Sequence, residues 1–569
     1  MISVILSWVY ILLICLFIGM GTFKLLSKLF NINFENFFAE VICGVTVITV
    51  YTEYFSIFYK ISILAHLIML IVALISAYIC KKRVLEICNS FKNIIKNKSI
   101  IPWLFTVLVV AFFTSRGVFH TDTGIYHAQT IRIYEEYGII KGLANLQLHF
   151  GYNSAYLAFC SIFTFSFILP EALHTTTGFL TIFCLIYALS GLRKIREHKK
   201  HGADGARIAI LLYILTNITG SMSPATDYGT MYLILYLLTE WLATCEEKSL
   251  EKNDETTKLS LLSVLAIFIV SVKLSGAGIV LLALYPLVIL IKQKRYRDIW
   301  IFLGLGFFSF LPYMIRNVIL TGWLFYPVSV IDLFNVSWKV PLASLEKDAA
   351  QISVWGKCLY DVTKKDYTLS QWFPIWWEGQ YQYEQMLLVS QLIGVLLLLI
   401  KFDLYLIKRY KLEFKILIFY IMLIVCELIW FFNAPFVRYG LAFLLMLPLC
   451  IAGDVIIDYK KPDKRGLIIY DSILVLIFIC FTSWINQYFM DDVVFVYHYL
   501  KSDTYVWQQP FDDSETETLD IDGVTVYYSV DGEINSYYNY PSSCYKSMAE
   551  SCTLIGDTIE EGFMPKENN

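Results

Sequence analysis

Apolar segments long enough to cross a membrane recur along most of this chain, and no other feature of the sequence constrains the fold as strongly. A bilayer core needs about 20 mostly apolar residues per helix, because lipid offers no partner for exposed backbone amides. The segments that meet or approach this length are residues 2–23, 39–57, 61–80, 101–118, 171–192, 207–222, 228–245, 259–272, 274–291, 298–319, 384–400, 413–432, 440–458 and 466–485. We therefore predict an all-α polytopic membrane protein with about 14 spans.

The composition excludes several other classes of protein. The chain is 57% hydrophobic and only 16% charged, whereas charged residues make up about a quarter of a soluble domain. Its net charge of -3 offers no basic excess to neutralise phosphates, so a nucleic-acid partner is not expected. The 13 cysteines are scattered and form no CxxC pair, which argues against a zinc or iron–sulfur site.

Basic clusters predict which side of the membrane each loop faces, because short cytoplasmic loops are enriched in Lys and Arg. They lie at residues 81–83, 193–200, 292–297, 408–411 and 460–465. Alternating spans place all of them inside only if the apolar stretch Asn153–Leu169 does not cross. We interpret that stretch as an interfacial or re-entrant helix, which leaves both termini extracytoplasmic.

Three polar pieces then face outward: loop 119–152, loop 322–383 and the acidic tail 486–569. The inner loops are too short for a catalytic domain, so any chemistry is expected at the outer face or within the membrane. We divide the chain into an N-terminal three-span extension (1–100), a core with the first outer loop (101–330), a second outer loop with the C-terminal spans (331–485), and the tail (486–569).

The first outer loop contains the most distinctive motif. Residues 121–129 read TDTGIYHAQ and place an acidic residue, Asp122, at the outer mouth of a span. An amphipathic helix follows, which Gly138 is expected to end, and then comes the apolar stretch 153–169. This order resembles the first periplasmic loop of integral-membrane glycosyltransferases of the GT-C superfamily, and more narrowly a bacterial group of GT-C-like proteins with a TDTGxYHAQ motif and a two-cysteine tail.

Weaker similarities follow along the chain. They are Ser223–Asp227 at an outer turn, Val272–Gly276, which resembles a T-K-x-x-G step between two spans, and Arg316–Pro327, which resembles the exit from a core helix. The resemblance implies a GT-C-like helix bundle in the bacterial inner (cytoplasmic) membrane. It also implies transfer of a sugar from a polyprenyl-phosphate donor to a cell-envelope glycan or lipid acceptor.

The resemblance assigns a general base to Asp122, which would deprotonate the acceptor hydroxyl while the anomeric centre inverts. Such a base must lie within hydrogen-bond reach of that hydroxyl. The alternative for Asp122 is an N-cap of the following helix. His127 lies about one turn away and is the expected catalytic partner of Asp122, while His120 and Tyr126 flank the motif as substrate-binding candidates.

Lys273, Arg316 and Arg438 are the candidate ligands of the donor phosphate, because they lie at the predicted outer ends of spans. Their alternatives are snorkelling for Lys273 and anchoring of helix ends for the two arginines. Asp227 is expected either to bind acceptor or to cap a helix. Glu135 and Glu136 are interpreted as a solvated helix face.

Two predictions concern metals and disulfides. Thr123 stands where the GT-C motif usually has a second acidic residue, so no acidic pair is present to hold a divalent metal. We predict no cofactor and do not favour a metal. Cys544 and Cys552 are the only cysteines of the tail, and in an oxidising compartment they are predicted to form a disulfide.

Other functions remain open from the sequence. An O-antigen or capsule polymerase or ligase also acts on lipid-linked glycan at the outer face, but depends on arginines of a large outer loop. A transporter of lipid-linked saccharides would carry internal repeats and ion-coupling charges at mid-bilayer. We detect no repeat, and Glu427 is the clearest mid-span acid. A non-catalytic partner of a glycan-assembly complex is a further alternative.

Overall fold

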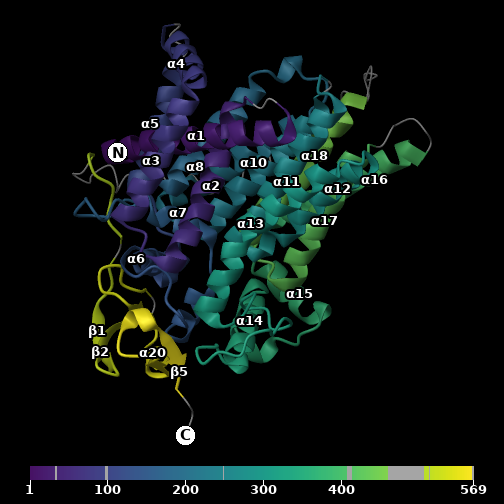
Figure 1. Cartoon of the computed structure of the whole chain (residues 1–569). Helices are drawn as coiled ribbons and strands as arrows, with labels where there is room; N and C mark the ends of the chain where they lie inside the picture. The colour runs from purple at the N-terminus through teal and green to yellow at the C-terminus, as the bar shows by residue number, and fades with distance from the viewer. Residues whose placement is uncertain are drawn as a thin grey trace.

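Long helices dominate the protein and pack side by side as a bundle (Figure 1). The computed structural model describes residues 1–32, 35–96, 100–247, 249–406, 413–458, 505–511, 513–532 and 534–566. The helices of the bundle and its loops are α1 (Ile2–Phe30), α2 (Phe37–Phe58), α3 (Ile63–Ile79), α4 (Lys81–Lys96), α5 (Ile101–Arg116), α6 (Ala128–Glu136), α7 (Ala155–Ser161), α8 (Thr176–Leu192), α9 (Gly202–Asn217), α10 (Thr226–Glu246), α11 (Lys252–Val272), α12 (Leu284–Lys292), α13 (Tyr296–Thr321), α14 (Leu342–Gly356), α15 (Leu369–Glu378), α16 (Gln382–Leu406), α17 (Phe414–Asn433) and α18 (Val437–Asp458).

Nine helical segments within the described residues are long and apolar enough to cross a membrane. A tenth arises if α3 and α4, which meet at a bend of 85°, count as one broken span. The predicted membrane character and helical class are therefore confirmed, but the predicted 14 spans are not reached. The predicted span 466–485 lies outside the described residues.

Three predicted spans differ from the helices that form. Span 101–118 corresponds to α5, a helix of 16 residues, and span 171–192 to α8, a helix of 17 residues. These are shorter than the roughly 20 residues that a bilayer core requires. Span 228–245 corresponds to α10, which has 21 residues but carries acidic and hydroxyl side chains and is not among the nine.

The stretch 153–169 does not form a spanning helix. Its only helix, α7, has seven residues and is buried along its whole length. At about 1.5 Å per residue it extends roughly 10 Å, a third of a bilayer core. The Asn153 side chain donates to the Tyr313 carbonyl of α13 at 3.0 Å, and α7 itself packs mainly against α2 and α6.

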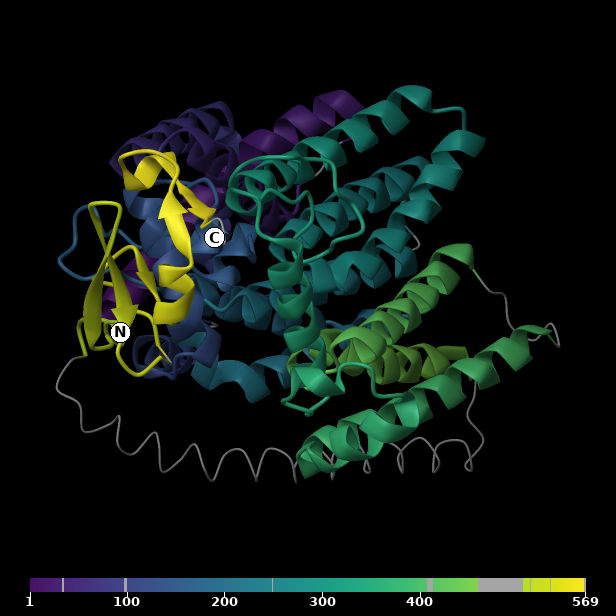
Figure 2. The same ribbon diagram turned by 90° about the horizontal axis from the view of Figure 1, so that it is seen from below.

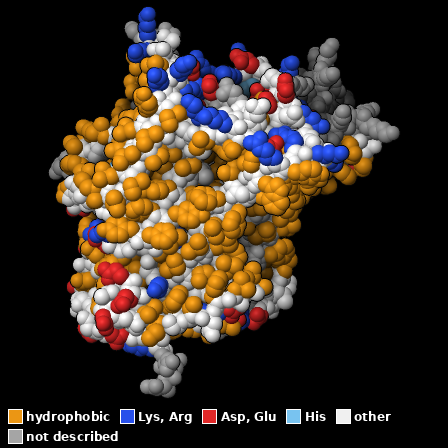
Figure 3. All heavy atoms as spheres, in the orientation of Figure 1, with side chains coloured by type: hydrophobic (Ala, Val, Ile, Leu, Met, Phe, Trp, Pro, Cys, Tyr) orange, Lys and Arg blue, Asp and Glu red, His pale blue; other side chains and the backbone are white. Residues whose placement is uncertain are grey.

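The two ends of the bundle differ in charge. Figure 3 shows Lys and Arg side chains gathered at one end, a broad apolar band across the middle, and acidic side chains at the other end. We call the first the basic end, which includes the loops 193–200 and 292–297, and the second the tail end, where the C-terminal residues lie. An apolar band between two polar ends is the surface that a lipid-embedded protein presents.

Helix α18 lies at the centre of the bundle. In its apolar window, 83% of the residues are buried, against 11% for α16, whose side chains mostly face outward. Helix α18 packs against α9, α16 and α17. The first residues of α18 are thereby held firmly at the tail end.

The tail forms a small β module that the sequence analysis did not predict (Figure 2). Its elements are β1 (Thr516–Ile521), β2 (Val524–Ser529), β3 (Ser542–Ser543), α20 (Lys546–Glu550), β4 (Cys552–Leu554) and β5 (Phe563–Pro565). Strands β1 and β2 are antiparallel, joined by Asp522-Gly523 with positive φ at both residues, as a tight hairpin requires. Strand β3 adds parallel to β2, and β4 pairs antiparallel with β5.

The tail module and the first outer loop share one apolar core. Its buried residues come from the loop (Tyr126, Ile133, Ile140, Leu143, Leu146, Phe150), from α13 (Leu320) and from the tail (Ile521, Val526, Ala549, Cys552, Leu554, Phe563). Gly138 ends α6 with φ of 80°, and a Cβ there would lie 2.8 Å from the Ser56 carbonyl oxygen. The loop therefore turns where it touches α2, which brings its apolar side against the tail.

The predicted disulfide between Cys544 and Cys552 is absent, and both thiols are free and buried. The Cys544 Sγ contacts the Ile125 carbonyl oxygen at 3.2 Å, in the first outer loop. The Cys552 Sγ contacts the Ala549 carbonyl oxygen at 3.2 Å, within the tail. The two thiols serve different contacts, so packing rather than a covalent bond holds the module together.

Candidate functional site

The predicted motif lies on an unusual turn. After α5 the chain is held against the start of α10: the Val118 amide donates to the Thr219 carbonyl at 3.0 Å and the His120 amide to the Ser223 hydroxyl at 3.1 Å. Asp122 then precedes a π-helical turn, Thr123–His127, which continues directly into α6. Such turns are rare and frequently mark functional sites.

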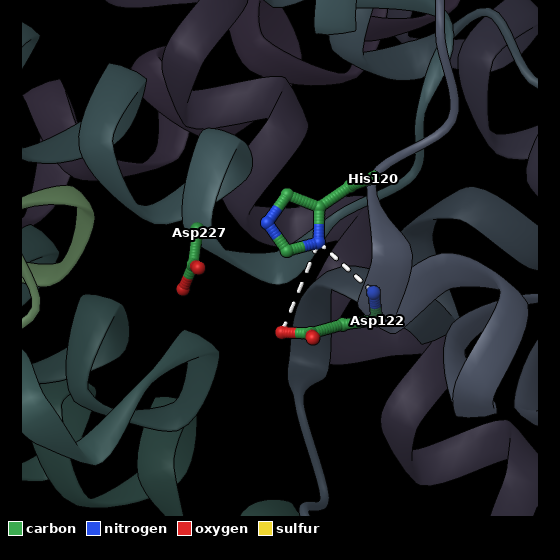
Figure 4. Close-up of side chains that lie close together, drawn as sticks. All are labelled: His120, Asp122 and Asp227. Atoms are coloured by element: carbon green, nitrogen blue, oxygen red, sulfur yellow. Dashed lines mark hydrogen bonds and ion pairs between the residues drawn. The ribbon is translucent and has the colours of Figure 1, made fainter. Parts of the chain in front are cut away.

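Asp122 points to a cation and not back to its own helix. Its side chain makes no capping hydrogen bond, which contradicts the N-cap alternative. The Arg438 Nη2 donates to Asp122 Oδ2 at 3.2 Å, and the His120 Nδ1 lies 3.8 Å from the same oxygen (Figure 4). The other ring nitrogen of His120, Nε2, lies 2.7 Å from Arg438 Nη1, and the backbone amide of Asp122 donates to His120 Nδ1 at 3.1 Å, so the ring is held between Arg438 and the Asp122 backbone.

A second carboxylate, Asp227 in the first turn of α10, faces the same place. Its partner is Lys273, whose Nζ donates to Asp227 Oδ1. Lys273 lies at a break between α11 and the 3₁₀ segment Leu274–Ala283, where its backbone is extended. The carbonyl of Val272 at that break accepts from the Ser154 hydroxyl at 2.7 Å. The break frees Lys273 from both flanking helices, so that its side chain reaches the cluster.

Arg438 joins the two carboxylates into one network. Its Nε lies 3.6 Å from Asp227 Oδ2, and its Nη2 donates to the Tyr439 hydroxyl at 3.2 Å. The Lys273 Nζ lies 3.9 Å from the centre of the Tyr439 ring. The turn before α18 is fixed by two indoles: Trp376 Nε1 donates to the Pro435 carbonyl at 2.8 Å, and Trp430 Nε1 to the Phe436 carbonyl.

We call His120, Asp122, Asp227, Lys273 and Arg438 the charge cluster. Its two carboxylates contact one arginine and one lysine, and it is open on one side. The exposed fractions of the side chains are 36% for Arg438, 23% for Asp122 and 22% for Lys273, but only 5% for Asp227. A ligand can therefore reach both cations without unfolding the loop.

The surroundings of Asp122 and His120 lower the pKa of both side chains. Burial raises the pKa of Asp122, but Arg438, His120, His127 and Lys273 together outweigh burial and bring that pKa below its ordinary value. Burial lowers the pKa of His120 to about 4, against the pull of Asp122 and with the help of Arg438 and Lys273. At neutral pH, Asp122 is ionised and His120 is neutral.

The structure brings five of the predicted site residues together and places the other three elsewhere. Tyr126 lies beside the cluster in the loop core, with its ring stacked on His149. His127 is buried, and its Nδ1 bonds the Thr123 hydroxyl at 3.2 Å, so it does not pair with Asp122 as predicted. His120, two residues before Asp122, takes that position.

Arg316 is the clearest correction among the phosphate ligands. It is fully buried in α13, its Nη1 donates to Glu53 of α2 at 3.2 Å, and its guanidinium lies over the Tyr134 ring at 4.8 Å. The position near a helix end suggested an exposed cation, but the acidic partner on α2 draws the side chain into the bundle. Arg316 joins α2, α13 and α6 and does not reach the charge cluster.

Glu135 also differs from its prediction as a solvated residue. It is 4% exposed, and its carboxylate accepts from Thr164 and, at 2.9 Å, from the Tyr537 hydroxyl of the tail. Burial raises the pKa of Glu135 to about 7, although Thr164, Arg132 and Tyr537 oppose the shift. Glu136 remains partly exposed and pairs with Arg132 at 3.0 Å.

The cluster contains donors that a divalent cation could use. One ligand atom each from His120, Asp122 and Asp227 lies within 4.8 Å of the other two. The absent second acid of the motif is thus partly replaced by Asp227 from α10, a grouping that the sequence analysis did not expect. However, both carboxylates already contact Arg438 or Lys273, so a metal would have to displace one of these side chains.

Several contributors to the site were missed. Tyr439 follows Arg438 directly and contacts both cations, and Ser223 holds the His120 backbone. Ser223 begins the segment Ser223–Asp227 noted in the sequence, and Tyr439 is the residue after the predicted Arg438. A separate cavity of about 370 Å³ lies at the basic end, lined by residues that include Lys199, Arg207 and Glu246, and is not part of this cluster.

A family model for a domain of unknown function, DUF8201, matches residues 1–445. The chain belongs to this family. The match covers the motif, the cluster and all helices up to the first turns of α18, and it ends before the tail module. No curated protein and no solved structure matches the chain.

Proposed function

We propose that the charge cluster is the active centre of a membrane glycosyltransferase of GT-C type. The enzyme transfers a sugar from a polyprenyl-phosphate donor to a glycan or lipid acceptor of the cell envelope. One observation carries the proposal: the ionised carboxylate of Asp122 accepts from Arg438 at 3.2 Å, with Lys273 in the same network, beside the turn that the tail module contacts. This reaction needs a general base for the acceptor hydroxyl and basic side chains for the donor phosphate, and Asp122, Arg438 and Lys273 can supply them.

The positive-inside rule orients the protein in a bacterial inner membrane. The basic end faces the cytoplasm, and the charge cluster and the tail module face outward. The Ser3 amide donates to the Val506 carbonyl at 2.9 Å, so the first residues lie beside the start of the tail module. Both termini are extracytoplasmic in this orientation.

In the proposed reaction the acceptor hydroxyl oxygen attacks the anomeric carbon of the donor. The bond from that carbon to the phosphate oxygen breaks, and the configuration inverts. Asp122 takes the hydroxyl proton, and polyprenyl phosphate leaves with the electron pair. Arg438 and Lys273 stabilise the charge that develops on the leaving phosphate.

Binding of the donor phosphate is also expected to change the pKa of Asp122. Without donor, Arg438 contacts Asp122 and keeps its pKa low, which makes the carboxylate a weak base. A bound phosphate competes for Arg438 and withdraws positive charge from Asp122. The pKa of Asp122 then rises toward the range in which a carboxylate accepts a proton more readily. Binding of the donor thus prepares the base.

The test uses the purified full-length protein in lipid nanodiscs. Asp122→Asn removes the base and one ionic partner of Arg438, so we expect polyprenyl monophosphate to bind at least as tightly as to wild type. With membrane extracts as the source of donor and acceptor, wild type should transfer sugar, and Asp122→Asn should be at least 100-fold slower. A variant that transfers at the wild-type rate would refute the mechanism.

A transporter of lipid-linked saccharides is the second candidate, because the bundle contains buried ion pairs. Glu53–Arg316 and Lys401–Asp454 are each almost inaccessible to solvent. Intramembrane charges of this kind mark ion pathways in transporters. Each is matched by its own partner at 3.2 Å or less, which favours a structural role. Flipping of a fluorescent lipid-linked sugar by Asp122→Asn vesicles, without transfer, would favour transport.

A further inference from the structure

The tail module reaches the turn that carries Asp122. The backbone N–H of Asn535 donates to the Gly124 carbonyl at 2.7 Å, inside the π-helical turn. Ile534 packs on the same residue, where a Cβ on Gly124 would lie 3.0 Å from a methyl carbon of Ile534. The tail module therefore contacts Gly124, which lies two residues after the proposed base Asp122.

Gln147 extends this contact through its side-chain amide. Its Nε2 donates to the Ile125 carbonyl at 3.1 Å, the next carbonyl of the π-helical turn. Its Oε1 accepts from the Asn535 side chain at 3.1 Å and from the Cys544 amide at 2.8 Å. Gln147 is fully buried, so these partners replace water entirely.

These bonds compensate a turn that is less favourable than an α-helix. A π-helical turn is wider than an α-turn and occurs only in short stretches. Outside donors to the carbonyls of Gly124 and Ile125 favour this geometry over a continuous α-helix. An α-helical turn there would rotate the residues before it, including Asp122, relative to Arg438.

We propose that the tail module is a brace for the active centre, with Asn535 and Gln147 as positioning residues. They fix the turn Thr123–His127 and thereby hold Asp122 against Arg438. Gln147 lies in the first outer loop, but Asn535 belongs to the tail module, beyond residues 1–445 that the family model matches, so the site depends on a residue outside the family domain. The consequence for transfer rests on the proposed function, but the consequence for the turn does not.

The experiment compares Asn535→Ala and Gln147→Glu with a matched control in the full-length protein. Asn535→Ala removes the bond to Gln147, and Gln147→Glu removes the donor to Ile125. Asn539→Ala is the control, because the Asn539 side chain bonds Thr516 within the tail at 2.9 Å and does not reach the turn. Hydrogen exchange of the amides of residues 121–129 and alkylation of the buried Cys544 thiol report on the turn and on the contact.

We expect the two brace variants to raise exchange and Cys544 alkylation at least tenfold, and the control to leave both unchanged. Unchanged exchange in both variants would overturn the brace. The acidic limb of the pH profile for transfer should also move to higher pH in the brace variants alone, because Asp122 loses its fixed contact with Arg438. Raised exchange with an unmoved pH profile would overturn the positioning role.

The same experiment separates the two proposals. If wild type transfers no sugar but exchange rises as expected, the proposed function fails and the brace stands. In that case binding of polyprenyl monophosphate by wild type and by Asn535→Ala supplies the second readout of positioning. We expect weaker binding by Asn535→Ala than by Asn539→Ala, and equal binding would overturn the positioning role.

Discussion

The Glu53–Arg316 pair and the charge cluster differ in one respect that matters for function. Glu53 and Arg316 form a pair inside the bundle, and neither side chain is exposed. In the charge cluster, by contrast, Arg438 contacts both carboxylates and is 36% exposed. The Glu53–Arg316 pair is inaccessible to ligands and links two helices. In the charge cluster, Arg438 is accessible and can bind a ligand phosphate in place of a carboxylate.

The comparison predicts opposite results for two arginine substitutions. Arg316→Ala leaves Glu53 buried without a partner, and breaking such a pair costs about 3–5 kcal/mol. We expect this variant to lose most of its folded, monodisperse protein, measured by thermal unfolding in detergent and by size exclusion. The double variant Glu53→Leu with Arg316→Leu should recover much of the loss, because no unpaired charge remains. Equal stability of Arg316→Ala and wild type would contradict the structural role.

Arg438→Ala should leave the fold nearly intact and remove binding. The guanidinium is partly exposed and its loss leaves Asp122 accessible to water, so the change in stability should stay below about 1 kcal/mol. Loss of one charge-assisted contact to phosphate should weaken polyprenyl monophosphate binding by roughly 10–100-fold. Arg438→Lys is the matched control, and it should bind at an intermediate level because lysine lacks the planar fork.

A third expectation concerns Glu135, which joins α6 to the tail module. Its pKa is raised by burial to about 7, so the docked state favours the protonated form. Its stabilisation is complete below its ordinary pKa of about 4.5 and is lost as pH rises through about 7. Docking of the tail should therefore weaken between pH 4.5 and 7, by up to about 3 kcal/mol.

The rate of Cys544 alkylation relative to that of the denatured protein at the same pH measures this docking, because the ratio removes the titration of the thiol itself. Arg132, Glu136, Tyr537 and Tyr540 are the charged or titratable groups near Glu135. Glu135→Gln removes the charge and keeps one accepting oxygen, with an amide donor in place of the other, as in the protonated carboxyl group, so its relative alkylation rate should be independent of pH. A pH-dependent rate in Glu135→Gln would assign the effect to another group.

The sequence predicted the bundle better than the site, for a physical reason. An apolar run has one favourable arrangement in lipid, so the run itself identifies the helix, as for α1, α2 and α13. Asp122, Asp227, Lys273 and Arg438 were found because each is polar beside an apolar run. Their pairing was not predictable, because it depends on which helix ends meet.

Arg316 and Glu135 show the limits of reading local sequence. Both were interpreted as exposed because they lie near a predicted helix end or on a polar face. Each is buried by a partner far away in sequence, Glu53 for Arg316 and Tyr537 for Glu135. The tail module was missed because its strands are short and take part of their core from the first outer loop. Only the Asp522-Gly523 dipeptide between β-branched runs carried a hairpin signal.

The smallest effect is expected from reduction of the protein. This experiment tests whether packing or a disulfide bond stabilises the tail module. Loss of a native disulfide typically costs 2–5 kcal/mol in a small domain. Because Cys544 and Cys552 are free and contact different carbonyls, a reductant should leave the thermal midpoint unchanged within about 1 °C. Alkylation after denaturation without reductant should label both thiols. A disulfide-linked peptide containing Cys544 and Cys552 would show instead that a disulfide bond, and not the apolar core shared with the first outer loop, stabilises the module.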